Sequence, residues 1–175
     1  MKSLFRSWLG VEQVETRADH TTLREVLDAL DKMEPERARY LARFAYLLGR
    51  VAHADQIVTA EETRTMERIL EREGHLPPDQ AALVIGLAKS SNRLFGGTDN
   101  YLVAREFEGQ ATQAQKIELL RCLFAVSTAE DGVSILEERE IQRIARELRI
   151  EPSVLVAMRL EFREHLPGLL KRRQT

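Results

Sequence analysis

The sequence predicts an all-α protein, a compact single-domain bundle of about seven to nine helices. Apolar residues recur at helical spacing along most of the 175 residues, and no stretch shows the sustained two-residue alternation of a strand. Nine glycines and five prolines fall mainly between the periodic segments. An internal repeat, described below, predicts two pseudo-symmetric helix-loop-helix units. We expect an N-terminal amphipathic or linker segment (1–20), a helical domain (21–166) and a basic tail (167–175).

The elements follow from start and stop signals. Thr22 and Glu25 have the spacing of a capping box that opens the first helix. Pro35 suits the first turn of the second helix, whose wide apolar stripe predicts a central, largely buried helix. Later breaks are marked in order by Gly74, Pro77, Gly96, Gly97, Gly109, Gly132 and Pro152. We therefore expect helices over 22–33, 36–54, 59–73, 78–92, 98–108, 112–129, 134–148 and 152–165.

Composition excludes several classes of protein. The 26 basic and 28 acidic residues give a net charge of −2. The chain therefore lacks the excess of positive charge that proteins binding nucleic acid usually carry. The single cysteine, Cys122, excludes an intramolecular disulfide and a Cys-rich zinc site, and its apolar helical context predicts an inert buried thiol. No apolar run reaches the ~18 residues of a membrane span, and no signal peptide is recognised at the start. We expect a cytoplasmic protein.

An internal repeat is the most informative feature of the chain. At an offset of 75 residues, the separation of Asp55 from Glu130, the segment from Leu48 to Glu62 matches the segment from Leu123 to Glu137. Each copy reads as a helix, a short acidic loop and a second helix. The paired positions are Val51 with Val126, Ala54 with Ala129, Asp55 with Glu130, Val58 with Val133, Thr59 with Ser134, Glu62 with Glu137, Arg68 with Arg143 and Ile69 with Ile144.

Part of this pattern has a structural explanation. Thr59 with Glu62, and Ser134 with Glu137, have the spacing of capping boxes. Asp55 and Glu130 are not explained in this way, because each is expected at the C-terminal end of an apolar helix. There the helix dipole disfavours a carboxylate by roughly 0.3 to 1 kcal/mol. Water, a basic partner or a cation must compensate.

The repeated loops suggest a hypothesis for binding a hard cation. If the loops converge, Asp55, Glu62, Glu130, Asp131 and Glu137 form an all-oxygen site that suits Ca²⁺, Mg²⁺ or Mn²⁺. Two carboxylates about 4 Å apart repel by roughly 4 kcal/mol at an effective dielectric of 20, so a converging set needs a cation or raised pKa values. The alternative is that these acidic side chains are simply solvated.

The two motifs resemble a known family. Ala54-Asp55-x-x-Val58-Thr59-x-x-Glu62 and Ala129-Glu130-Asp131-Gly132-Val133-Ser134-x-x-Glu137 are similar to the acidic helix-loop-helix signatures of the tellurite-resistance TerB family, over roughly 36–166. The closest likeness is to stand-alone bacterial TerB-like proteins. This resemblance implies an all-helical domain with pseudo-twofold halves, a cytoplasmic or inner-membrane-associated setting, and a candidate metal-binding cluster at the repeat loops.

The function we expect is that of a non-enzymatic module in bacterial stress and tellurite, or metal-oxyanion, resistance. It would bind a divalent cation or scaffold other proteins, with no catalytic residue and no nucleic-acid partner. One alternative is a metal-free helical interaction domain, in which capping explains the motifs completely. A third interpretation is a metal-dependent hydrolase, although no catalytic His or Ser constellation accompanies the carboxylates. A homodimer is left open.

The ends of the chain suggest a second surface. Leu4, Phe5, Trp8 and Leu9, with Lys2 and Arg6, form an amphipathic segment that either lies on the inner membrane or packs on the bundle or a partner. The basic run 171–173 would add about 1 kcal/mol per residue at an anionic surface. His53 lies two residues before Asp55, but its repeat equivalent is Thr128, so we expect no ligand role for it.

Overall fold

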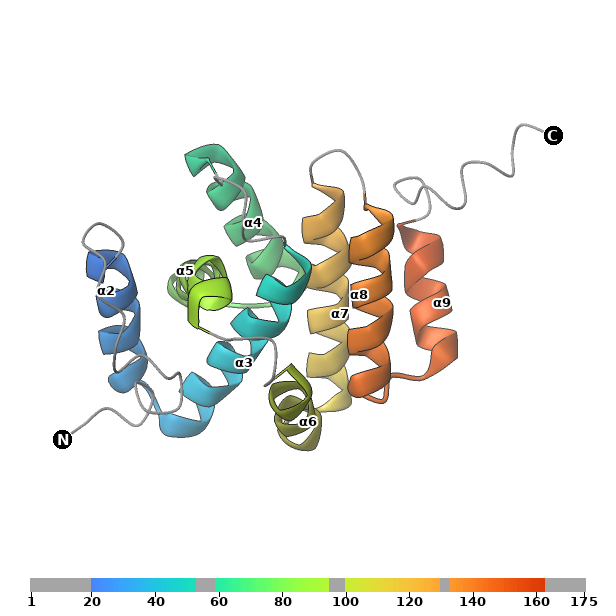
Figure 1. The fold of residues 1–175 in the computed structure, drawn as a ribbon, viewed down its shortest axis with the longest axis horizontal. Coiled ribbons are helices and arrows are strands. Elements are labelled where there is room, and N and C mark those ends of the chain that lie inside the picture. The colour runs from blue at the N-terminus through green and yellow to red at the C-terminus, as the bar shows by residue number, and fades with distance from the viewer. Residues whose placement is uncertain (1–19, 53–58, 95–99, 130–132, 163–175) are drawn as a thin grey trace.

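The computed structural model describes residues 20–52, 59–94, 100–129 and 133–162, which form eight α-helices and no strand. This confirms the all-α prediction. Figure 1 shows α2 at one end of the molecule and α9 at the other, with α7, α8 and α9 side by side. The helices are α2 (His20–Asp31), α3 (Pro35–Val51), α4 (Ala60–Glu73), α5 (Pro78–Leu94), α6 (Asn100–Gln110), α7 (Gln113–Thr128), α8 (Ile135–Glu147) and α9 (Pro152–Glu161).

Helix α3 is the centre of the fold, as its apolar stripe predicts. It packs against α2, α5, α6, α7 and α8. Every residue from Leu41 to Gly49 is buried, so this part of the helix is surrounded on all sides. The helix begins after Glu34, whose carboxylate accepts hydrogen bonds from the amides of Glu36 and Arg37, and Pro35 occupies its first turn.

One hydrophobic core connects the helices on both sides of α3. Phe44, Phe107 and Phe124 are its largest fully buried side chains. The ring of Phe107 in α6 stacks on Tyr40 of α3, with ring centroids 5.5 Å apart. Phe124 of α7 stacks on Phe162, just after α9, at 5.6 Å. Aromatic contacts therefore join α6 to α3 and the end of α9 to α7.

Most predicted helix starts agree with the structure, and one does not. Capping boxes form at Thr59, Thr112 and Ser134, each with a Glu or Gln three residues later. The cap predicted at Thr22 is wrong, because α2 begins at His20 and Thr22 is its third residue. The spacing of Thr22 and Glu25 also fits a helix interior, so the motif alone does not fix where the helix begins. Within the described ranges, no helix is both long enough and apolar enough to cross a bilayer.

Candidate functional site

The candidate site consists of two helix-loop-helix hairpins, α3 with α4 and α7 with α8. Of the five carboxylates predicted to bind a cation, Glu62 and Glu137 are described, and each lies in the first turn of the second helix of its hairpin. Asp55, Glu130 and Asp131 lie outside the described residues. The geometry below therefore concerns the framework of the hairpins and its two capping carboxylates.

The first hairpin holds Glu62 by a reciprocal cap. The amide of Thr59 donates to Oε2 of Glu62 at 2.5 Å, and the amide of Glu62 donates to Oγ1 of Thr59 at 3.2 Å. The hydrogen bond from the Thr59 amide lowers the pKa of Glu62. The Thr59 hydroxyl and the charge of Lys89 lower it further. Lys89 of α5 also donates a hydrogen bond to the hydroxyl of Thr63. A basic side chain therefore already lies near this carboxylate.

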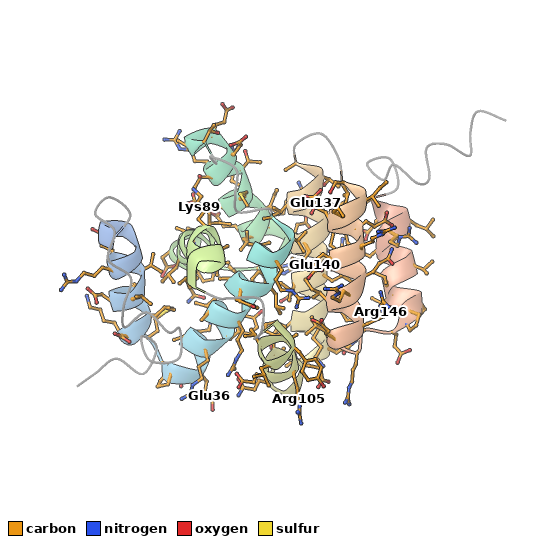
Figure 2. All side chains as sticks on the ribbon, viewed as in Figure 1. Glu36, Lys89, Arg105, Glu137, Glu140 and Arg146 are labelled. Atoms are coloured by element: carbon orange, nitrogen blue, oxygen red, sulfur yellow. The ribbon has the colours of Figure 1, made fainter. Side chains whose placement is uncertain are left out.

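The second hairpin repeats the cap at Glu137. The amide of Ser134 donates to Oε2 of Glu137 at 2.7 Å, and the amide of Glu137 donates to Oγ of Ser134 at 3.1 Å. Figure 2 labels Glu137 at the start of α8. In both hairpins the cap amide is thus bonded to Oε2, and the capping bond does not use Oε1. The capping role predicted for both carboxylates is confirmed.

The hairpins pack on each other reciprocally. Helix α4 of the first hairpin packs on α7 of the second, and α8 of the second packs on α3 of the first. Each second helix therefore covers the first helix of the other hairpin, as a twofold relation requires. The approach of α4 to α7 is close at Gly74, where a Cβ would lie 3.0 Å from Sγ of Cys122. The two repeats form one packed unit.

An arginine whose side chain is largely covered links the hairpins but has no counterpart in the repeat. Arg50 in α3 has a side chain only 6% exposed, and it contacts two carboxylates of α8. Nη2 lies 2.6 Å from Oε1 of Glu140, labelled in Figure 2, and Nη1 lies 2.7 Å from Oε2 of Glu147. Burial disfavours the charged guanidinium, but the bonds to Glu147 and Glu140 outweigh it and the pKa of Arg50 is raised. Its repeat equivalent is Ala125.

Sequence reasoning missed this ion pair network. The signal was the position of Arg50, a charged residue directly before Val51 on a helix whose preceding residues are apolar. An arginine in that context needs buried acceptors, because an unpaired charge in a core is costly. The partners lie about 90 residues further along the chain, and no local pattern identifies them.

The repeat is also longer than the motifs indicated. Both second helices end at a residue with positive φ, His75 at 50° and Arg149 at 53°. A buried aliphatic residue follows each, Leu76 and Ile150, and a proline then opens a third helix, α5 or α9. Pro78 and Pro152 are 74 positions apart, and so are His75 and Arg149, because α8 is one residue shorter than α4. The order of local features therefore repeats from α3-α4-α5 to α7-α8-α9, although α5 packs extensively on α3 and α4 and α9 makes far fewer contacts with α7 and α8.

Other reactive groups in the described residues have structural surroundings. Cys122 is buried, and burial raises the pKa of its thiol, in agreement with an inert role. His75 is exposed, with Nδ1 3.4 Å from Oε1 of Glu118. Among the described residues, no group of three or more His, Cys, Asp or Glu side chains is arranged to hold a metal ion. His53 lies outside those residues.

One buried polar group lies directly before the second acidic loop. Oγ of Ser127, near the end of α7, is buried and has no hydrogen-bond partner among the described residues. Its repeat equivalent is Ala52. A buried hydroxyl without a partner costs free energy unless water or another ligand satisfies it. Ser127 thus places a buried hydroxyl, without a partner among the described residues, three positions before Glu130.

A pocket of about 380 Å³ lies at the other end of α3. It is lined by the start of α3, the end of α6 and the start of α7, with Tyr40 and Phe107 in its wall. Its two guanidinium groups are already bonded, Arg37 to Gln80 and Arg43 to Glu106 and Gln110. None of its lining residues belongs to α4 or α8, the second helices of the hairpins.

Comparison with known proteins agrees with the repeat. Residues 41–160, more than half of the chain, match the family model described as "Tellurite resistance protein TerB". No curated protein and no solved structure matches the chain. The matched range begins within α3 and ends within α9, so it covers both three-helix units that the structure places together. The chain belongs to the TerB family.

Proposed function

We propose that the protein is a non-enzymatic TerB module in which a divalent cation, bound between the acidic loops of the two hairpins, fixes a surface that partner proteins recognise. The observation that carries this proposal is the reciprocal packing of α4 on α7 and α8 on α3. In such an arrangement equivalent loops are related by one pseudo-twofold axis, so one ion near that axis would interact with both copies. The role lies in bacterial stress and tellurite resistance.

Asp55 and Glu130 would supply the central ligands, with Asp131, Glu62 and Glu137 completing the set. The capping bonds hold Glu62 and Glu137 through Oε2 and leave Oε1 as the atom that would coordinate an ion. Oxygen ligands of this kind suit Ca²⁺, Mg²⁺ or Mn²⁺. The unsatisfied hydroxyl of Ser127 adds a polar group near the second loop, where a bound water could bridge to the ion.

A bound cation would act on a rigid framework. The pairing of Arg50 with Glu140 and Glu147 joins α3 to α8 in the interior, so the two hairpins cannot separate without breaking buried ion pairs. Ion binding would therefore order the loops rather than open the bundle. A partner protein would then recognise the ordered loops. Direct binding of the tellurite anion to this acidic region is disfavoured by charge repulsion, so resistance would be indirect.

The test is calorimetry with Ca²⁺, Mg²⁺ and Mn²⁺ on the full chain, compared with the double variant Asp55→Asn with Glu130→Gln. We expect heat and a raised Tm with one of these ions, and at least a tenfold loss of affinity in the variant. Glu151→Gln is the control, because Glu151 is exposed and makes no side-chain capping bond at the start of α9. Equal affinity in all three proteins would place the ion elsewhere and refute the assignment.

A metal-free interaction domain is the second candidate. It is favoured by the two complete capping boxes, which give Glu62 and Glu137 a structural role without any ion. No heat and no thermal shift with any of the three ions would favour this function over the first. Cytoplasmic location and peripheral contact with the inner membrane are parts of the same proposal, tested by fractionation of cells that express the protein.

A further inference from the structure

Helix α9 carries an exposed stripe without charge. Ser153, Val156, Ala157 and Leu160 are all exposed, and their spacing of three, four and seven residues places them on one face of the helix. Val156 is 53% exposed and Leu160 is 54% exposed. Single exposed apolar residues are common, but a complete helical stripe of small and aliphatic residues has the composition of a packing surface. We call these four residues the α9 stripe.

The internal repeat shows what covers the same face in the first unit. At the offset of 74 residues, Leu160 corresponds to Gly86 of α5. Gly86 faces α2, because a Cβ at this position would lie 3.1 Å from Cγ2 of Val26. Helix α2 packs along α5 with its apolar residues, including Leu27 and Leu30, buried. Helix α2 therefore covers the part of this face at Gly86, whereas Asp79 and Ala82, the equivalents of Ser153 and Val156, are exposed in α5.

Exposed charges of both signs lie on α9 and on the neighbouring helix α8. Helix α8 is joined to α9 by the ion pair of Glu138 and Arg159, and it exposes Arg139, Arg143 and Arg146 at spacings of four and three residues. Figure 2 labels Arg146 on this part of the molecule. Glu161 at the end of α9 is exposed as well, although its Oε1 already pairs with Nη1 of Arg121 in α7 at 3.0 Å. A suitable partner helix would carry both acidic and basic residues beside its apolar face.

We propose that the α9 stripe is the docking site for residues 1–19 of a second copy of this chain. That segment carries Leu4, Phe5, Trp8 and Leu9 at helical spacing, which suits an apolar surface on one side of a helix. Its Lys2 and Arg6 are opposite in charge to Glu161. The acidic residues that follow, Glu12 and Glu15, are opposite in charge to the arginines of α8. The proposal does not depend on the acidic loops and goes beyond the cation-binding function.

The position of α2 indicates that the docked segment comes from another molecule. Residues 1–19 directly precede α2, and Figure 1 shows α2 and α9 at opposite ends of the molecule. Two copies that exchange these segments form a closed dimer, whereas exchange in one direction only forms an open chain.

The test uses Trp8, the single tryptophan of the sequence, as a reporter of the segment. Sedimentation velocity and Trp8 emission are measured on the full chain over a hundredfold range of concentration. We expect association and a blue shift of Trp8 emission to rise together with concentration. Leu160→Glu should weaken both at least tenfold. Leu102→Glu in α6 is the matched control, because Leu102 is also 54% exposed and should leave both unchanged.

Three outcomes would overturn the proposal. A monomer with solvent-exposed Trp8 at every concentration would show that the segment does not dock. A blue shift that is independent of concentration would place the segment on its own molecule. A blue shift that appears only when anionic vesicles are added would assign the segment to a membrane surface. Unfolding of Leu160→Glu and Leu102→Glu, followed by circular dichroism, should give the same Tm for both, so that lost association is not mistaken for lost folding.

Discussion

The two three-helix units share a pattern but differ in how their third helices are buried. In the first unit, α5 packs against α3 and α4 and is covered by α2, and Val84, Ile85 and Leu87 are buried. In the second unit, α9 buries only Met158 and lies at the edge of the molecule (Figure 1). Similar local signals thus give helices with different surroundings. What a repeated helix contributes depends on which neighbours the rest of the chain provides.

The largest effect is expected at the ion pairs that join the units. Replacing Arg50 by Met leaves Glu140 and Glu147 without their buried partner and should lower the free energy of unfolding by about 3 to 5 kcal/mol. Urea denaturation at neutral pH measures the loss. Arg68→Met, at an exposed position of α4, is the control and should stay within about 0.5 kcal/mol of the original protein. An equal effect of the two variants would contradict the structural role of Arg50.

The second prediction compares the same substitution in the two third helices. Leu87→Ala in α5 removes a side chain that is 4% exposed and should cost about 2 to 5 kcal/mol. Leu160→Ala in α9 removes one that is 54% exposed and should cost less than about 0.5 kcal/mol. Both are measured by denaturation at a low protein concentration, where association through α9 does not contribute. Similar costs would mean that α9 is covered within the monomer.

The third prediction uses the feature in which the two units agree. Thr59→Ala and Ser134→Ala each remove one capping box and should each cost about 1 kcal/mol. Thermal denaturation of the two single variants and the double variant measures the costs, which should add. If Thr59→Ala and Ser134→Ala lower the stability by strongly different amounts, one cap has a second role, such as placing its glutamate in an ion site.

The first cap should also depend on pH. The Thr59 amide lowers the pKa of Glu62 in the folded state below its ordinary 4.5. The carboxylate therefore contributes stability that is fully present above pH 4.5 and is lost as pH falls through the lowered value. Unfolding measured between pH 3 and pH 6 should show this loss, and Glu62→Gln should remove that part of the dependence. A profile unchanged by Glu62→Gln would contradict the assignment.

The smallest effects are expected at the two left-handed turns. His75 and Arg149 have positive φ values, which cost free energy for residues other than glycine. His75→Gly and Arg149→Gly should each raise the stability by less than about 1 kcal/mol, because glycine adopts this conformation without steric cost but loses more entropy on folding. Arg146→Gly, in the last turn of α8, is the control and should lower the stability. Calorimetry should give a higher Tm for the two turn variants and a lower Tm for Arg146→Gly.

Several features of the fold could be predicted from the chain alone. The order of the described helices, the central position of α3 and the capping boxes at Thr59 and Ser134 all follow from patterns within a few residues. The start of α2 was predicted wrongly at Thr22, since a polar residue with a glutamate three positions later fits a helix interior as well as a cap. The cation site as a whole stays a prediction, because Glu62 and Glu137 are seen only as helix caps and Asp55, Glu130 and Asp131 lie outside the described residues.

The sequence by itself determined the helices, most of their ends and the duplication, because hydrophobic period, caps and turn residues act over one or two helical turns. Only the tertiary structure decided that Arg50 binds Glu140 and Glu147, that α4 packs on α7, and that Leu160 faces outward where its counterpart Gly86 faces α2. These outcomes depend on which helices meet across long separations in the chain. The energy of such contacts is set by burial and pairing, which no local pattern encodes.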